Sequence, residues 1–281
     1  MQTFTDPLMG AKAAARMMHG KKTVVVAGAG MSTDSGIPDY RGKGSTDIPT
    51  VDYDQFIRFS QWRRWVWYRN QQTWRTVESL EPTPAHYALK ELQDMGIITT
   101  IATQNVDALD EKAGCRDVQL LHGTFRSVTC VDCGEVFDRD VIDTELRRLN
   151  PDMEYDNDPA HVAILASADT VASRQCDFVV APCPTCGGII KPSVVFFGEM
   201  LPAQAMENSF EAARQADIVL IAGTSLAVLT GLYVAREAWE NGARVIIINR
   251  GPTSADTFAD IRINAGVSQT LSAIVKELKN I

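Results

Sequence analysis

Short apolar runs alternate along this chain with longer stretches in which apolar residues recur at helical spacing. The runs are rich in β-branched residues and are bounded by glycine, aspartate or asparagine, which is typical of strands buried on both faces. They occupy residues 24–27, 97–103, 218–222 and 245–249, with a shorter one at 261–264. Helical spacing covers residues 6–19, 84–95, 203–215, 227–241 and 268–280. This alternation predicts an α/β fold with a Rossmann-like, doubly wound parallel sheet.

Small and polar residues follow four of the predicted strands. They occupy residues 28–41, 104–107, 223–225 and 249–251. A doubly wound sheet binds its ligands at the carboxyl ends of its strands. These four segments are therefore the candidate binding site.

The segment after the first of these strands has the composition of a phosphate-binding turn. Gly28 and Gly30 lack a Cβ, so the backbone can approach a ligand closely and present its N–H groups to phosphate. The usual dinucleotide motif has a third glycine where this chain has Thr33. A tight turn without a ligand is the alternative. Pro38 follows and breaks any helix, so the predicted site includes an irregular polar loop.

Two stretches interrupt the alternation of strand and helix. Residues 42–80 hold four of the five tryptophans and have an amphipathic helical pattern from Tyr53 onward. We expect their aromatic side chains in a core and their arginines in solvent, with a minority lining a ligand channel. The second stretch contains two pairs of cysteines. The predicted organisation is a discontiguous Rossmann-like domain (residues 1–41, 81–123 and 191–281), a helical module with a cofactor loop (42–80) and a zinc-binding module (124–190).

Two C-x-x-C pairs, each followed by glycine, are typical of a zinc site. Forty-nine residues separate them, so an insertion with predicted helices at 139–150 and 161–172 must loop out between the pairs. Four thiolates in this pattern surround one Zn²⁺ tetrahedrally, in a closed and structural site. A redox dithiol and disulfides are the alternatives, but disulfides do not fit a chain without a secretory signal. The predicted ligands are Cys130, Cys133, Cys183 and Cys186, while Cys115 and Cys176 are left as buried or incidental thiols.

One of the four histidines is a candidate general base. His122 follows an apolar approach and immediately precedes the cysteine-containing stretch, where the chain crosses between modules. An imidazole at a predicted cleft suits general-base catalysis near neutral pH. A structural role is the alternative for His122, and it is the expected one for His19 and His86, while His161 is expected at the surface.

Composition and charge exclude some classes of partner. The chain has 281 residues, is 45% hydrophobic and 22% charged, and carries a net charge of −8. A negative chain lacks the basic face that nucleic acid requires, although it can still bind a basic peptide. No apolar run is as long as a membrane span, and the first twenty residues lack the features of a signal peptide or presequence. We therefore expect a cytoplasmic monomer that binds neither membrane nor nucleic acid.

Seven motifs, taken in order, resemble those of the sirtuins, which are NAD-dependent protein lysine deacylases. The resemblance covers the chain from about residue 23 to the C-terminus, and seven ordered motifs are far more specific than any one. The motifs are residues 28–41, 103–107, 122–123, the two cysteine pairs, 191–199, 223–226 and 248–250. Residues 39–42 with 63–70 resemble the class II branch, so the chain is similar to a bacterial class II-like member.

The resemblance implies which residues bind NAD and substrate. Asn105, with Ser32 and Gln104, would order the nicotinamide ribose and its water, and Ile37 and Asp107 would hold the carboxamide. The full cofactor set is Gly28, Ala29, Gly30, Ser32, Thr33, Ile37, Asp39, Tyr40, Arg41, Gln104, Asn105, Asp107, Gly223, Thr224, Ser225, Asn249, Arg250, Gly251 and Val267. An acyl-lysine peptide would add as a strand along Val195, Phe196, Phe197, Gly198 and Glu199.

The resemblance also implies the reaction, with His122 and Asn105 as the catalytic residues. The acyl oxygen of the lysine amide attacks C1′ of the ribose and nicotinamide leaves. His122 takes a proton from the ribose hydroxyls, so that the 2′-oxygen attacks the imidate carbon and water releases lysine and O-acyl-ADP-ribose. The alternatives are transfer of ADP-ribose to protein, hydrolysis of NAD, and a non-catalytic NAD sensor held together by zinc.

The absence of one motif indicates which acyl groups the chain does not prefer. Sirtuins that remove succinyl or malonyl groups carry a Y-x-x-R pair in the helical module. Here Tyr53 is followed by Phe56 and Tyr68 by Gln71, so the pair is absent and we expect no pocket that prefers acidic acyl groups.

Overall fold

The computed structural model describes residues 1–37, 51–155 and 177–281, and its largest element is a parallel sheet. The sheet has seven strands in the order β1-β10-β9-β8-β2-β3-β4. All of its neighbouring pairs are parallel. The strands are β1 (Gln2–Phe4), β2 (Thr23–Ala27), β3 (Ile98–Thr103), β4 (Val118–Leu120), β8 (Ile218–Ala222), β9 (Arg244–Ile248) and β10 (Ile261–Ile263).

The predicted α/β fold with a Rossmann-like sheet is confirmed. All five apolar runs that predicted strands form β2, β3, β8, β9 and β10. The two edge strands, β1 and β4, were not predicted, because each has three residues and too few positions to show a pattern.

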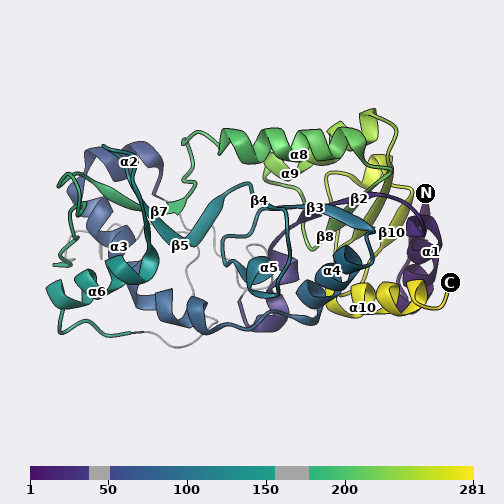
Figure 1. The fold of residues 1–281 in the computed structure, drawn as a ribbon, viewed down its shortest axis with the longest axis horizontal. Helices are drawn as coiled ribbons and strands as arrows, with labels where there is room; N and C mark the ends of the chain where they lie inside the picture. Colours follow the sequence, from purple (N-terminus) through teal and green to yellow (C-terminus); the bar gives the residue numbers. More distant parts are fainter. Residues whose placement is uncertain (38–50, 156–176) are drawn as a thin grey trace.

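Helices cover both faces of this sheet (Figure 1). One face packs on α1 (Pro7–Met18), α4 (Pro84–Asp94) and α10 (Val267–Leu278), and the other on α8 (Ala203–Gln215) and α9 (Leu229–Glu240). Successive residues of β2 point to opposite faces, so Val25 joins the first core and Val24 and Val26 join the second. Each predicted helix of the sheet domain is present, and Asp6 caps α1 by accepting the Leu8 N–H at 2.8 Å.

A second, smaller sheet is antiparallel and lies at the opposite end of the molecule from the termini (Figure 1). Its strand order is β6-β5-β7, with β5 (Gly123–Cys130), β6 (Val136–Asp138) and β7 (Ile190–Val194). The predicted helix at 139–150 is confirmed as α6 (Arg139–Leu149). The helix predicted at 161–172 lies outside the described residues, as do His161 and Cys176.

The aromatic stretch forms α2 (Tyr53–Arg58) and α3 (Ser60–Ser79), and these helices share a core with the small sheet. Trp65, Trp67 and Trp74 are buried there, as expected for core aromatics. The Arg139 guanidinium of α6 lies 5.3 Å from the Trp67 ring centroid and 5.1 Å from that of Trp74. Arg139 also donates to Gln71 Oε1 at 2.7 Å, so a buried cation joins α3 to α6. Within the described ranges, no helix is long and apolar enough to cross a membrane.

Candidate functional site

The predicted glycine turn packs directly against the turn that follows β8. The Gly30 N–H donates to Gly223 O at 2.8 Å, and the Gly28 N–H donates to Ala222 O at 3.1 Å. A Cβ on Gly30 would lie 2.8 Å from Gly223 Cα, closer than real Cβ atoms come. Gly223 has φ 65°, which favours glycine. The glycines are therefore required first for the contact between two strand ends, which brings residues 28–30 beside residues 223–225.

Polar side chains after β2 and β3 form one buried cluster. Asn105 Nδ2 donates to Gly28 O at 3.1 Å and to Ser32 Oγ at 3.2 Å, and Ser32 Oγ donates to Asp107 Oδ2 at 2.7 Å. All three side chains are buried. The structure thus brings together three residues that the sequence assigns to one end of the nicotinamide nucleotide. Thr33 lies beside them, with its hydroxyl donating to Gly30 O at 3.3 Å.

A second layer of titratable groups lies behind Asp107 and was not predicted as part of the site. Burial and the charge of Asp107 raise the pKa of Asp110 to about 7, and burial raises the pKa of Asp107 itself. Burial lowers the pKa of His86 to about 4. The Thr83 N–H donates to His86 Nδ1, so the proton of the neutral ring is on Nε2, 4.0 Å from Asp110 Oδ1. His86 is therefore structural, as predicted, but it faces a carboxyl group with an unusual titration.

We expect Asp110→Asn to change how stability depends on pH. The folded-state pKa of about 7 lies above the ordinary 3.8, so the folded protein holds the proton between these values and the unfolded chain does not. The contribution of Asp110 to the free energy of unfolding is fully present below about pH 3.8 and is lost as the pH rises through 7. Since asparagine resembles the protonated acid, the stability of the variant relative to wild type should increase between pH 5 and pH 7 by about 1.4 kcal/mol per pH unit, and then stay level at higher pH.

Urea unfolding at pH 5, 6, 7 and 8 measures this difference. Asp152→Asn makes the same change at an exposed position and should give a constant difference from wild type. His86 titrates in both proteins, so it affects the difference only through its coupling to Asp110, 4.0 Å away. A difference between Asp110→Asn and wild type that stays flat with pH would show that Asp110 titrates normally.

His122 lies between β4 and β5, and its ring is held from two sides. Its Nδ1 lies 3.0 Å from Gln104 O, and its Nε2 lies 2.8 Å from Thr230 Oγ1. A carbonyl can only accept, so Nδ1 carries the proton of the neutral ring and Nε2 has the free lone pair. Burial lowers the pKa of His122, while the bond to Gln104 O raises it. The ring is therefore neutral near pH 7 and basic at Nε2, as a general base requires.

Residues after β8 reach the same cluster. Thr224 Oγ1 donates to Gln104 Oε1 at 2.9 Å, and Gln104 Nε2 donates to Thr230 Oγ1 at 3.1 Å. Ser225 O accepts the Ser254 N–H at 3.0 Å. Gln104 thus links the ends of β3 and β8 to the segment that contacts His122. Thr230, at the start of α9, was not predicted as a site residue, since it lies inside a predicted helix and belongs to no motif.

Residues after β9 form the far side of the site. The Gly251 N–H donates to Asn264 Oδ1 at 3.0 Å, and Asn249 Nδ2 donates to Arg250 O at 3.0 Å. The Arg250 guanidinium lies against Gly266, where an added Cβ would be 2.9 Å from Nη2. Gly266 precedes Val267, the buried first residue of α10, so the predicted cofactor residues Arg250 and Val267 lie close together. The predicted loop residues Asp39, Tyr40 and Arg41 lie outside the described residues, whereas Ile37 is buried in a small cluster with Leu80 and Leu109.

The predicted substrate segment follows β7 as a loop, and it connects the base to the helical module. The Val195 N–H donates to His122 O at 2.8 Å, and Phe197 O accepts the Tyr53 N–H at 2.9 Å. Glu199 shapes the loop, because its Oε2 accepts the Phe196 N–H at 2.9 Å and its Oε1 lies 3.1 Å from Lys191 Nζ. Gly198 has φ 82° in the turn of this loop. Lys191 is buried, and its position in the sequence predicts no separate role for it.

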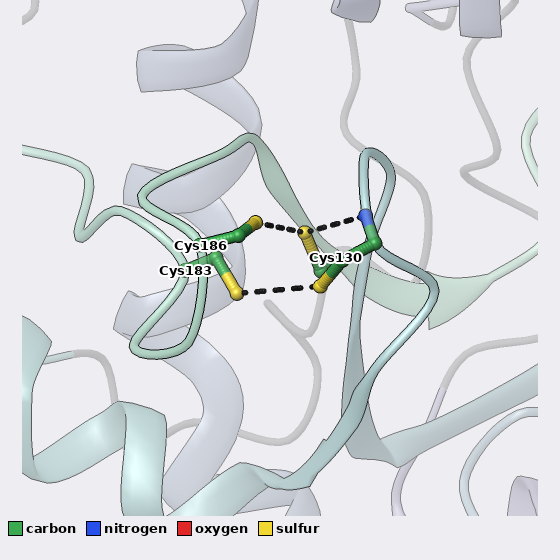
Figure 2. Close-up of side chains that lie close together, drawn as sticks. Cys130, Cys183 and Cys186 are labelled. Carbon is green, nitrogen blue, oxygen red and sulfur yellow. Dashed lines mark hydrogen bonds between the residues drawn. The ribbon is translucent and has the colours of Figure 1, made fainter.

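The four predicted zinc ligands converge on one point (Figure 2). Cys130 Sγ lies 3.6 Å from Cys186 Sγ, and Cys133 Sγ lies 3.8 Å from Cys183 Sγ. All four sulfur atoms lie within 4.8 Å of one another. A tetrahedron with Zn–S bonds of about 2.3 Å has S···S edges of about 3.8 Å, so these thiolates fit Zn²⁺. None of the four forms a disulfide, which removes that alternative for the two pairs.

Backbone turns hold the sulfur atoms in place. The Gly134 N–H donates to Cys130 O at 3.0 Å, and the Gly187 N–H donates to Cys183 O at 2.9 Å. Asp132 Oδ2 accepts the Ile189 N–H at 2.7 Å and connects the two turns. Cys115 is separate from this cluster, and burial raises the pKa of its thiol to about 12.

Comparison with known proteins gives consistent similarities. The Sir2 family matches residues 28–230. The chain is 36% identical over 263 residues to NAD-dependent protein deacetylase 1 of Mycobacterium avium, covering 93% of each chain. It is 36% identical over 261 residues to the human mitochondrial NAD-dependent protein lipoamidase sirtuin-4, covering 90% of this chain and 82% of the relative. A solved structure of Sir2 with a p53 peptide and NAD⁺ has a TM-score of 0.74 at 25% identity, over 96% of this chain and 99% of that one.

Proposed function

The chain belongs to the Sir2 family, and we propose that it uses NAD to remove acyl groups from lysine side chains of proteins. The products are nicotinamide, O-acyl-ADP-ribose and free lysine. The observation that carries the proposal is the meeting of Asn105, Asp107 and His122 around the ends of β2, β3 and β8. NAD-dependent deacetylases and a lipoamidase among the relatives, and Sir2 structures with NAD and peptides, support the same activity.

We assign the residues around the strand ends to NAD. Bound there, NAD supplies an ADP-ribosyl group that accepts the acyl group. Residues 28–33 and 223–225 would hold its phosphates, together with Asn249, Arg250 and Gly251, and Val267 would contact the adenine. Ser32, Asn105 and Asp107 already form hydrogen bonds with one another, so they can orient the nicotinamide ribose and carboxamide with little rearrangement. Ile37, Gln104 and the loop residues Asp39, Tyr40 and Arg41 complete the assigned site.

We assign the proton transfer to His122. Its Nε2 is unprotonated when the ring is neutral, because Nδ1–H is held by Gln104 O. The ring can therefore receive a proton from a ribose hydroxyl and become an imidazolium. Residues 195–199 lie beside it and would pair with the substrate peptide through backbone hydrogen bonds, which tolerate many sequences.

The four cysteines would hold Zn²⁺ as a structural ion. A site with four thiolates leaves no open position for a water or a substrate, so the metal supplies no chemistry at the reaction centre. We propose that it stabilises a module of residues 124–190, between a helical module of residues 42–80 and the discontiguous sheet domain.

The identity of the acyl group is a second part of the proposal. The relatives include both deacetylases and a lipoamidase. The helical module lacks the Y-x-x-R pair, so we infer a neutral acyl group rather than succinyl or malonyl. We further infer a cytoplasmic monomer whose partners are acyl-lysine proteins or peptides, since a net charge of −8 disfavours nucleic acid.

Nicotinamide release from NAD, followed by mass spectrometry of the products, tests this function. The zinc-loaded protein is assayed without peptide and with acetyl-, propionyl-, succinyl-, longer-chain acyl- and lipoyl-lysine peptides. Release that depends on a neutral acyl-peptide, with matching O-acyl-ADP-ribose, is the expected result. Equal release without peptide would indicate NAD hydrolysis, and ADP-ribosylated protein would indicate transfer to protein. Absence of release with every peptide would favour a non-catalytic NAD sensor.

A further inference from the structure

Thr230 is the one hydroxyl that contacts the basic nitrogen of His122 among the described residues. Its Oγ1 lies 2.8 Å from Nε2, and the two residues are 108 positions apart in the sequence. Thr230 is 7% exposed, so water competes little for this hydrogen bond. The tertiary fold therefore creates this hydrogen bond and shields it from water.

The direction of the hydrogen bond follows from its neighbours. Gln104 Nε2 donates to Thr230 Oγ1 at 3.1 Å, so the threonine oxygen already accepts one hydrogen bond. Because Nε2 of the neutral ring has no hydrogen, the threonine hydroxyl must donate to it. The Gln104 amide therefore donates to Thr230, and the Thr230 hydroxyl donates to His122. The first of these hydrogen bonds strengthens the second.

Local sequence permits this close approach. Gly231 follows Thr230, and a Cβ there would lie 2.9 Å from Val26 Cγ1 and 3.0 Å from Gln104 Cδ. A larger residue would push the start of α9 away from β2 and from Gln104. The Thr230–Gly231 pair therefore supplies a hydroxyl and the space to place it.

We propose that Thr230 is a positioning residue that orients the His122 ring and keeps Nε2 available as the base. This inference rests on the proposed function in one respect, because the proposed function gives the His122 ring its role as the base. A hydrogen bond donated to the neutral form favours that form, so removing it should raise the pKa of His122.

Charged groups near the ring do not compete with this effect. The titratable groups on the surrounding elements are Asp107 after β3, Asp117 before β4, Arg126 and Cys130 on β5, Lys191 on β7 with Glu199 in the loop after it, and Tyr233, Arg236, Glu237 and Glu240 on α9. In the part of the chain that the structure describes, none of them forms an ion pair with His122. Burial and the Gln104 carbonyl are the causes of its pKa shift.

Titration of the His122 imidazole by NMR in Thr230→Val tests the proposal without using the reaction. Valine keeps the shape and removes the hydroxyl, while Gln104 Nε2 keeps Val228 O as an acceptor at 3.1 Å. We expect the pKa of His122 to rise by about 0.5 to 1 unit, the effect of one net hydrogen bond. Thr230→Ser should restore the wild-type pKa. The chain has only four histidines, so a His122→Ala spectrum assigns the signal.

Kinetics and a matched control separate this inference from the proposed function. Thr144→Val removes a hydroxyl from an exposed helical position on α6 and should leave the His122 titration unchanged. For Thr230→Val we expect kcat to fall about 3- to 10-fold with little change in the KM for NAD, as for one lost hydrogen bond. An unchanged or lowered pKa of His122 would overturn the proposal. A raised pKa with wild-type turnover would support the role of Thr230 and would count against His122 as the base.

Discussion

Replacing His122 by alanine is expected to lower NAD-dependent deacylation by about 10²- to 10⁴-fold, the usual contribution of a general base. The ring is neutral, its Nδ1–H is fixed by Gln104 O and its Nε2 is basic. The ring acts in the proton-transfer step, so the loss should fall on kcat, with a smaller effect on the KM for NAD. Nicotinamide release measured with a saturating acyl-peptide gives both constants.

His19→Ala is the matched control for this experiment. His19 ends α1 at an exposed position and should be replaceable without effect on turnover. Circular dichroism and metal content would establish that His122→Ala is folded. Full turnover in folded His122→Ala would require another base and would refute the assignment of the proton transfer.

Replacing Cys183 by serine is expected to remove the metal and unfold the small sheet with its attached helices. Structural zinc contributes about 10 to 16 kcal/mol of binding free energy in small modules, and that free energy stabilises the fold. Cys183 is 2% exposed, and its Sγ lies 3.8 Å from Cys133 Sγ. The zinc content, measured by mass spectrometry, should fall from about one per chain to near zero. Thermal unfolding should show early loss of the aromatic signal from the tryptophans packed on this module.

Cys115→Ala provides the control, since Cys115 is buried away from the cluster and should leave the zinc content unchanged. Treatment of wild type with a strong chelator should reproduce the Cys183→Ser result. If Cys183→Ser kept both its zinc and its unfolding temperature, the four cysteines would not be the structural site.

Local patterns allowed much of the fold to be predicted. Strands buried on both faces are continuous apolar runs, so β2, β3, β8, β9 and β10 are visible in the sequence without knowledge of their partners. Helices with one apolar face are visible for the same reason. The short strands β1 and β4 and the antiparallel strands β5 to β7 were not predicted. Their formation depends on pairing with distant segments rather than on their own residues.

The candidate site divides in the same way. Residues in motifs, such as Asp107, His122 and the cysteines, were identified because their chemistry and spacing are local. Thr230 and Asp110 have no such signal and were found only by their neighbours in space. The glycines were identified from the sequence as a phosphate-binding turn. The structure shows a second reason for glycine at position 30, because this residue contacts the Gly223 turn.

By itself, the sequence determined the parallel α/β sheet, the four metal ligands and the ordered motifs, because residue type and spacing encode each of these over short distances. Only the tertiary structure decided which nitrogen of His122 is basic, which hydroxyl faces it and which carboxyl groups share a buried layer. These properties arise where the ends of β2, β3 and β8 meet, and they depend on the parallel register of the strands. Contacts between residues more than 100 positions apart follow from that register and cannot be inferred from either segment alone.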